Sequence, residues 1–139
     1  MKSRLFLAGA AVLTAAVVPL AAHHSFAAEY DGSALVTLKG VVSKVEWTNP
    51  HAYIYVDVKD ESGKVTTWGM EGYPPNTLTR TGFTRHIVSQ GDTITITGYR
   101  ARDNASRAAA REVTTADGKK YNFGPAAMDA PNTSKGAKQ

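Results

Sequence analysis

Segments in which apolar and polar residues alternate are the feature that most constrains how this chain can fold. Residues 52–58 alternate strictly, with Ile54 and Val56 in one phase, and residues 93–100 repeat the pattern. An alternation with a period of two residues is typical of strands that bury only one face. Turn sequences such as residues 59–63 separate these segments. The pattern therefore predicts an all-β domain.

The order of the expected elements narrows the all-β class. We expect strands at residues 34–47, 52–58, 65–72, 93–100 and 108–115, a short helix at 76–81, and a short sixth strand or extension at 121–123. In the first strand the apolar phase changes near Gly40, where a glycine can host a bulge or a bend. This order predicts a small five- to six-stranded barrel of the oligonucleotide/oligosaccharide-binding (OB) type, with one short helix between strands three and four. Another small barrel, or a sandwich of six or seven strands, is the alternative.

The beginning of the chain has the pattern of an export signal. Lys2 and Arg4 precede an apolar run over residues 5–22, and two histidines follow. A basic region, an apolar region and a cleavage zone in this order predict a signal peptide, with an uncleaved anchor as the alternative. We expect a signal peptide at residues 1–22, a lead-in at 23–33, the barrel at 34–124 and a disordered tail at 125–139. The mature protein is then periplasmic or secreted, without stable insertion in a membrane.

The cleavage position decides whether two histidines belong to the mature protein. Cleavage after Ala21 or Ala22 keeps His23 and His24 at or beside the new α-amino group, whereas cleavage after Ala27 removes both. An α-amino group with neighbouring imidazoles provides nitrogen ligands in a roughly planar set, which suits Cu(II). The alternative is a flexible terminus with incidental histidines.

His51 is the third candidate ligand. It follows Pro50 and precedes a strand at the expected barrel rim, where OB domains bind ligands. We expect copper to be bound by His23, His24 and His51 if the N-terminus folds back to this rim. The alternative is a histidine that only bonds a loop carbonyl. A carboxylate could orient such a ligand histidine. The candidates near strand ends are Asp31, Glu46, Asp57 and Glu71.

Aromatic residues suggest a second kind of binding face. Tyr53, Tyr55 and Tyr99 are expected to face outward on adjacent strands, and Trp68 adds a fourth ring. Such rings can stack on sugars or bases. Packing against the lead-in, the tail or a partner is the more common use of an aromatic stripe.

Composition and motif content exclude several classes of function. The chain has no cysteine, so disulfides, cysteine-based metal sites and thiol catalysis are excluded. It lacks the Gly-x-Ser-x-Gly elbow, the His-Glu-x-x-His motif and a phosphate-binding glycine loop, and we therefore expect that it is not an enzyme. Removal of the signal leaves a net charge of +2, without a cluster of five basic residues. This balance predicts that nucleic acid is not a partner.

Five motifs carry a resemblance to a known family. They are His23-His24-Ser25-Phe26, Glu29-Tyr30-Asp31, Gly40-Val41-Val42, Trp47-Thr48-Asn49-Pro50-His51 and Gly91-Asp92. From His23 to about Asp117 the chain resembles an uncharacterised family of small exported bacterial proteins, a domain of unknown function. The resemblance implies that the histidine pair belongs to the mature protein, and it implies no activity.

A looser resemblance is to the small periplasmic OB-fold chaperones for copper and silver, which hold Cu(I) with histidine and methionine beside a tryptophan. Trp68 and Met70 share a strand face here, but a second methionine nearby is missing. The leading hypothesis is an exported, non-catalytic binding module of unknown specificity, with copper as the candidate cofactor. One alternative is a structural module that docks on a periplasmic protein partner without metal. The other is a binder of sugars or acidic metabolites. The sequence does not indicate the oligomeric state.

Overall fold

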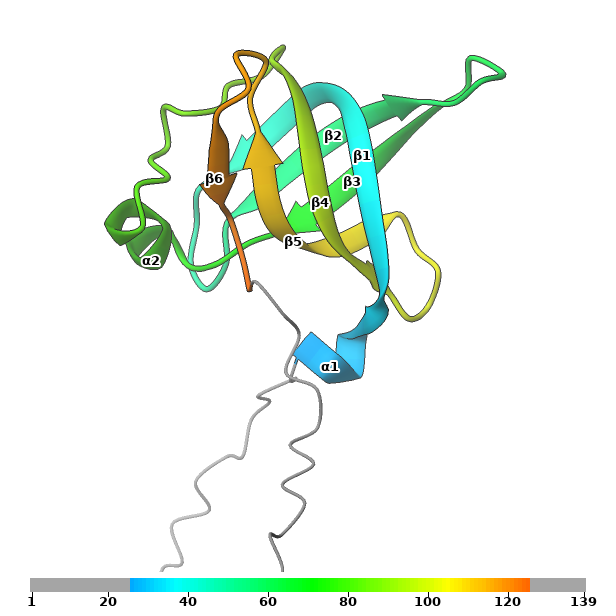
Figure 1. The fold of residues 1–139 in the computed structure, drawn as a ribbon. Helices are drawn as coiled ribbons and strands as arrows, with labels where there is room; N and C mark the ends of the chain where they lie inside the picture. The colour runs from blue at the N-terminus through cyan, green and yellow to red at the C-terminus, as the bar shows by residue number, and fades with distance from the viewer. Residues whose placement is uncertain (1–25, 126–139) are drawn as a thin grey trace, which may run out of the picture.

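Strands form where the sequence alternates, and the structure is all-β apart from two short helices (Figure 1). The computed structural model describes residues 26–125. Its elements are α1 (Phe26–Glu29), β1 (Tyr30–Glu46), β2 (Tyr53–Lys59), β3 (Val65–Glu71), α2 (Pro75–Arg80), β4 (Thr93–Ala101), β5 (Arg107–Thr114) and β6 (Lys120–Asn122). The predicted all-β class is confirmed, and α2 is the helix expected between the third and fourth strands. The expected signal peptide, His23, His24 and most of the expected tail lie outside the described residues.

The six strands form one sheet that closes into a barrel. The strand order is β3-β2-β1-β4-β5-β6, and a further parallel pairing of β3 with β5 joins the two sides into a ring of five strands. In that pairing Met70 lies opposite Ala108. Beyond the ring, β2 and β3 continue as a projecting hairpin (Figure 1). A closed sheet leaves few unpaired strand edges, so the barrel positions side chains around a rigid rim.

The long strand β1 serves both halves of the barrel. Its first part pairs with β4, and its last part pairs with β2, with Val41 in both pairings. A Cβ atom at Gly40 would approach the carbonyl oxygen of Asp57 to 2.3 Å, and the irregularity in the pairing of β1 with β2 follows just after it, between Val42 and Lys44. Only glycine lets the two strands come this close. β1 also begins at Tyr30 rather than at residue 34, because Tyr30 already pairs with Ala101 of β4.

The main core fills the barrel, and a smaller cluster lies apart from it. Aliphatic side chains from β1, β2 and β4 form the centre, and Phe83 and Phe123 cover one end with their rings 4.9 Å apart. The second cluster contains Tyr30, Tyr99, Ala101 and Ala109. It lies where the chain enters β1, and it anchors the first residue of that strand.

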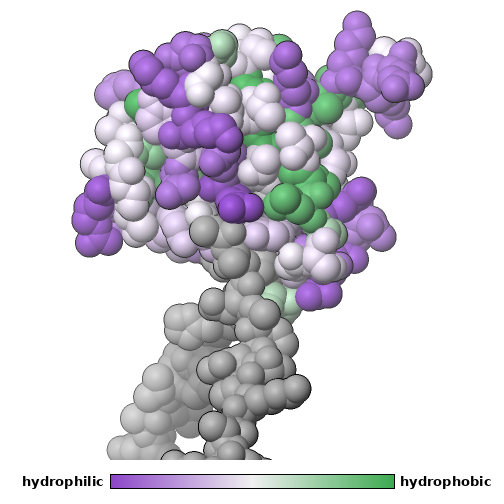
Figure 2. Space-filling model, in the orientation of Figure 1, coloured by the Kyte–Doolittle hydropathy of each residue, from purple (hydrophilic) through white to green (hydrophobic). Residues whose placement is uncertain are grey.

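The outer surface in the view of Figure 2 is mixed, with apolar side chains in small patches between charged ones. Within residues 26–125 the exposed large apolar side chains are Leu35, Val41 and Val65. Scattered apolar side chains of this kind are normal on a protein surface. No helix in the described part of the chain is long and apolar enough to cross a membrane.

Candidate functional site

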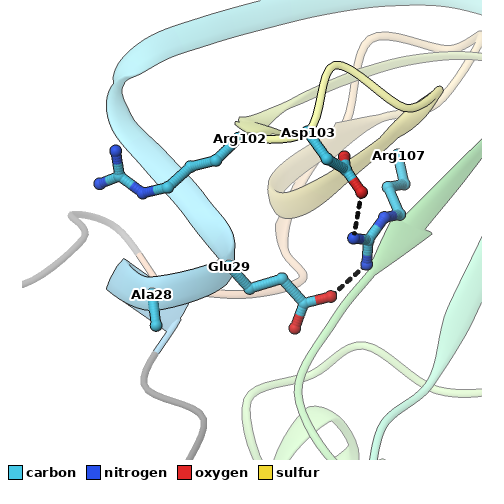
Figure 3. Close-up of a pocket in the computed structure, with 5 residues that line it drawn as sticks. All are labelled: Ala28, Glu29, Arg102, Asp103 and Arg107. Carbon is cyan, nitrogen blue, oxygen red and sulfur yellow. Dashed lines mark hydrogen bonds and ion pairs between the residues drawn. The ribbon is translucent and has the colours of Figure 1, made fainter.

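The short helix α1 is fastened to the loop between β4 and β5. The Nε atom of Arg102 donates a hydrogen bond to the carbonyl oxygen of Ala27 at 2.9 Å, and the backbone N–H of Arg102 donates to that of Glu29 at 3.0 Å. The guanidinium of Arg107 pairs with the carboxylates of Glu29 and Asp103 (Figure 3). These contacts hold the segment before Tyr30 against the barrel.

A pocket of about 430 Å³ lies among these residues, and its charges already balance one another. It is lined by Ala28, Glu29, Arg102, Asp103 and Arg107 (Figure 3). Hydrogen bonds from Arg107 to Asp103 and then to Glu29 raise the pKa of the arginine above its usual value. Both acids are engaged with Arg107, and the Nε atom of Arg102 is bonded to the carbonyl of Ala27, so the polar groups of this pocket fasten α1 to the loop.

The adjacent residue, Tyr30, connects this segment to a buried carboxylate. Its hydroxyl donates a hydrogen bond of 2.5 Å to Oε2 of Glu71, the last residue of β3. Glu71 is only 7% exposed, and it is the one buried charged residue within the described range. The pairing of β2 with β3 places Tyr53 directly opposite Glu71, on the same face of the sheet.

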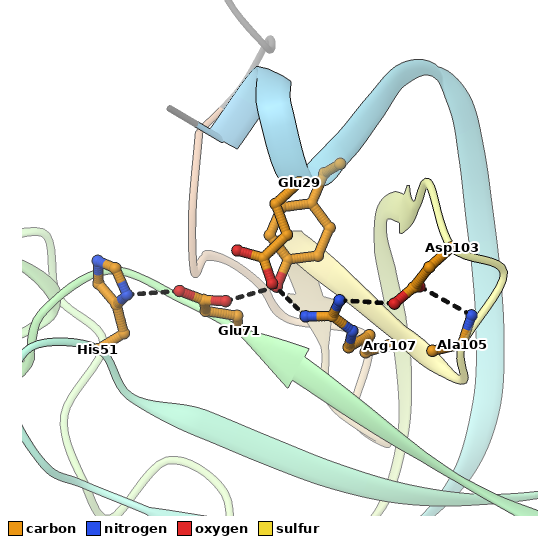
Figure 4. Close-up of polar contacts among 7 residues, drawn as sticks. Glu29, His51, Glu71, Asp103, Ala105 and Arg107 are labelled. Carbon is orange, nitrogen blue, oxygen red and sulfur yellow. Dashed lines mark hydrogen bonds and ion pairs between the residues drawn. The ribbon is translucent and has the colours of Figure 1, made fainter. Parts of the chain in front are cut away.

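The other oxygen of the Glu71 carboxylate, Oε1, pairs with Nδ1 of His51 (Figure 4). We call Tyr30, His51, Tyr53 and Glu71 the Glu71 cluster. Burying a carboxylate is costly unless hydrogen bonds or an opposite charge compensate. The Tyr30 hydroxyl at the start of β1 and the His51 imidazole just before β2 supply that compensation here, and Tyr53 lies beside them.

The tyrosines of the cluster remain protonated donors at neutral pH. Burial raises the pKa of Tyr30, and the hydrogen bond to Glu71 and the charge of Glu71 raise it further. Burial also raises the pKa of Tyr53, and the negative charge of Glu71 adds to the effect. Both phenols therefore keep their protons at neutral pH, and Tyr30 donates its proton in the hydrogen bond to Glu71.

His51 lies at the edge of the cluster, with its side chain 32% exposed. Nδ1 is directed at Glu71, and Nε2 lies on the opposite side of the ring (Figure 4). A carboxylate that holds one ring nitrogen of a histidine is the arrangement found behind metal-binding histidines, because it fixes the ring and makes the other nitrogen a better ligand. The described residues contain no group of three His, Asp or Glu side chains that could hold a metal ion. His51 would therefore need ligands from elsewhere, and the predicted partners His23 and His24 lie outside the described residues.

The other candidate carboxylates contact other groups. Asp31 accepts hydrogen bonds from Ser33. Glu46 pairs with Lys44 and accepts a hydrogen bond from Tyr55 at 3.2 Å. Asp57 accepts one from Thr67 at 2.6 Å. Glu71 is thus the candidate that the fold brings to a histidine.

The four aromatic residues of the predicted ligand face do not lie together. Tyr53 and Tyr55 stack at 6.1 Å on the outer face of β2. Trp68 lies opposite Val56, on the core side of the sheet, with the guanidinium of Arg100 5.3 Å from its ring centre. Tyr99 is only 7% exposed, in the second cluster with Tyr30. The register places Tyr99 on the same outer face of the sheet as Tyr53, as expected, but Tyr99 is covered there, and Trp68 lies on the core face.

The looser resemblance to the copper chaperones does not extend to their methionine ligand. Met70 does share a strand face with Trp68, but its side chain is fully buried in the main core. A buried thioether packs as an apolar group and is out of reach of an ion at the surface.

Among solved structures, the mitochondrial single-stranded DNA binding protein Rim1 of S. cerevisiae is similar, with a TM-score of 0.46 and 8% identity. The likeness covers 64% of this chain and 96% of that chain. This finding corrects the expectation about partners, which excluded nucleic acid, since the similar chain is named for binding single-stranded DNA. The likeness itself assigns no ligand to this protein.

No curated protein matches this chain. The model of a family of unknown function matches residues 11–110, in agreement with the predicted resemblance to an uncharacterised domain. That range contains β1 to β4, His51 and Glu71. The chain therefore belongs to this family of unknown function, DUF6152.

Proposed function

We propose that this protein is an exported, non-catalytic binding module that holds Cu(II) at the barrel rim through His51, His23 and His24. The observation that carries the proposal is the position of Glu71, which contacts His51 with one oxygen and Tyr30 with the other. One carboxylate thus orients a candidate ligand and fastens the start of β1 beside it. An imidazole held in this way, together with an α-amino group and further imidazoles, forms a nitrogen set that suits Cu(II).

The length of chain between Tyr30 and the two histidines supports the proposal. His24 precedes Tyr30 by six residues. Each residue extends a chain by at most about 3.6 Å, so His24 lies within about 22 Å of Tyr30. This limit keeps both histidines close to the start of β1, and so at a high local concentration near the Glu71 cluster.

If the chain is exported, the contacts of α1 favour a cleavage site before Phe26. Cleavage after Ala27 would remove the carbonyl group that accepts the hydrogen bond from Arg102. It would also remove half of α1, which runs from Phe26 to Glu29. Cleavage after Ala21 or Ala22 leaves these contacts in place and keeps both histidines in the mature protein.

The proposal is tested on protein recovered after export. Intact mass gives the cleavage position, and titration with Cu(II), followed by calorimetry and by electron paramagnetic resonance, gives the affinity and the nitrogen ligands. We expect one copper ion per chain. His51→Gln should weaken binding by about tenfold or more, and replacement of both His23 and His24 by alanine should abolish it.

The matched control is His86→Gln, because His86 is exposed in the connection between α2 and β4. This variant should bind copper as the unchanged protein does. Equal affinities for His51→Gln and His86→Gln would contradict the role of His51. A mature protein that begins after Ala27 would contradict the role of the histidine pair.

A further inference from the structure

A second concave site lies between the end of β1 and the connection from α2 to β4. It has a volume of about 290 Å³, and its walls include Val45, Trp47, Arg85 and Val88, with Lys44 at one side. We call it the Trp47 pocket. None of its residues belongs to the Glu71 cluster, so what it binds is independent of the copper proposal.

The apolar wall of the pocket is held by the main core. The indole of Trp47 stacks on Phe83, with ring centres 6.2 Å apart and planes inclined by 22°. Val88 is buried, and Val45 packs against the same core. A flat aromatic surface fixed from behind is suited to a planar apolar group, because no side chain has to be ordered on binding.

Of the two positively charged side chains at the pocket, only Arg85 is available to a ligand. The Nζ atom of Lys44 pairs with Glu46 and lies 5.5 Å from the ring centre of Tyr55, so its charge is already balanced. Arg85 is exposed and has no ion pair or hydrogen bond with any described residue. An unpaired guanidinium beside an apolar wall can bind a carboxylate through two parallel hydrogen bonds.

Two carboxylates lie close to the pocket lining in sequence, Glu46 and Asp92, and neither pairs with Arg85; Glu46 pairs with Lys44. The residues that line the pocket include no acid. Asp92, which follows them in the chain, accepts a hydrogen bond at 2.8 Å from the backbone N–H of Ser89. This arrangement differs from the pocket under α1, where two acids occupy Arg107.

We propose that the Trp47 pocket binds a small organic anion with a planar apolar body, of the class of aromatic carboxylates. The carboxylate pairs with Arg85, and the ring lies against Trp47 and Val88. The volume is at the lower end of the range of ligand pockets, which corresponds to a ligand with a single ring. The hydroxyl of Ser89 and the amide of Gln90, both at the pocket, can accept or donate hydrogen bonds to ring substituents.

The test uses benzoate as the probe and the copper-free protein. The indole N–H signal of Trp47 is followed by nuclear magnetic resonance, and Trp68→Phe identifies which of the two indole signals belongs to Trp47. We expect a saturable shift of this signal with benzoate. Benzyl alcohol, which has the same ring without the charge, should bind about tenfold more weakly.

Two variants decide whether the arginine and the pocket are responsible. Arg85→Gln should weaken benzoate binding by about tenfold. Arg80→Gln removes an exposed positive charge from α2 and should leave the binding unchanged. Equal binding of benzoate and benzyl alcohol, an equal effect of the two variants, or no saturable shift of the Trp47 signal would each overturn the proposal. His51→Gln should not change benzoate binding, so failure of the copper proposal would not be mistaken for failure of this one.

Discussion

The Glu71 cluster and the Trp47 pocket differ in how their charged side chains are compensated. In the cluster, a buried carboxylate is satisfied by Tyr30 and His51. In the pocket, an exposed guanidinium at Arg85 is left without a partner among the described residues. The first arrangement is complete within the chain, and the second becomes complete only when an anion arrives.

This difference separates two ways in which a barrel can use a polar side chain. A satisfied buried group fixes neighbouring side chains in one orientation, and its removal damages the fold. An unpaired exposed group adds little to stability, because water solvates it in the unligated protein. Stability measurements on variants of the two sites can therefore distinguish a side chain that orients its neighbours from one that is available to a ligand, without any ligand being present.

The largest effect is expected for Glu71→Ala. The change leaves the hydroxyl of Tyr30 and the imidazole of His51 without their common acceptor. We expect a loss of about 3 kcal/mol in the free energy of unfolding. Urea denaturation followed by tryptophan fluorescence measures this loss.

The matched variant in the other site is Arg85→Ala. It should change the free energy of unfolding by no more than about 0.5 kcal/mol, because Arg85 is exposed and makes no contact that the fold needs. If Glu71→Ala and Arg85→Ala had similar effects, the distinction between the two sites would be lost.

An intermediate effect is expected at alkaline pH, through Tyr30. In the unfolded chain this tyrosine ionises near its ordinary pKa of 10.0, whereas burial and Glu71 raise the pKa in the folded protein. The unfolded state therefore releases a proton that the folded state keeps. The contribution of Tyr30 to stability is fully present below pH 10 and decreases as the pH rises above it. The slope approaches about 1.4 kcal/mol per pH unit for this group.

Comparison of the unchanged protein with Tyr30→Phe isolates this contribution. The variant is less stable near neutral pH, because Glu71 loses a donor, but its stability should decrease less steeply between pH 10 and 11. Chemical denaturation at several pH values measures both slopes. Parallel curves would show that Tyr30 does not hold its proton in the folded state.

Most of the fold could be predicted from the alternation of residues, because it depends on local patterns. The bend near Gly40, the helix α2 and the strands on either side of it all have local signals. The helix α1 and the early start of β1 have none. They depend on contacts of Arg102 and Arg107 with a distant part of the chain, and on an irregularity in the pairing of β1 with β4 between Tyr30 and Leu35. The alternation of apolar and polar residues cannot predict such a change of register between paired strands.

The candidate site was only partly within reach of the sequence. His51 was identified from its place before β2, and Glu71 was one of four carboxylates that spacing could not separate. The sequence of the β2–β3 hairpin could have separated them. If Lys59 pairs with Val65 across the turn, the register places Tyr53 opposite Glu71. The same register places Trp68 on the core face, away from Tyr53 and Tyr55. The contribution of Tyr30 needed the three-dimensional structure, since 41 positions separate it from Glu71.

The smallest effect is expected for Arg107→Gln, which separates the attachment of α1 from the Glu71 cluster. The side chains of Arg107 and its partners Glu29 and Asp103 are 39%, 35% and 56% exposed, so solvent screens both ion pairs. We expect a loss of about 0.5 kcal/mol or less, which decreases further in 0.5 M salt. Hydrogen exchange of the backbone N–H of Arg102, which bonds the carbonyl of Glu29, should become faster, while that of Tyr53 in β2 should not change. Faster exchange at both positions would mean that the contacts of α1 and the Glu71 cluster open together as one cooperative unit. The pocket under α1 would then belong with the Glu71 cluster, and not with the Trp47 pocket, in this comparison.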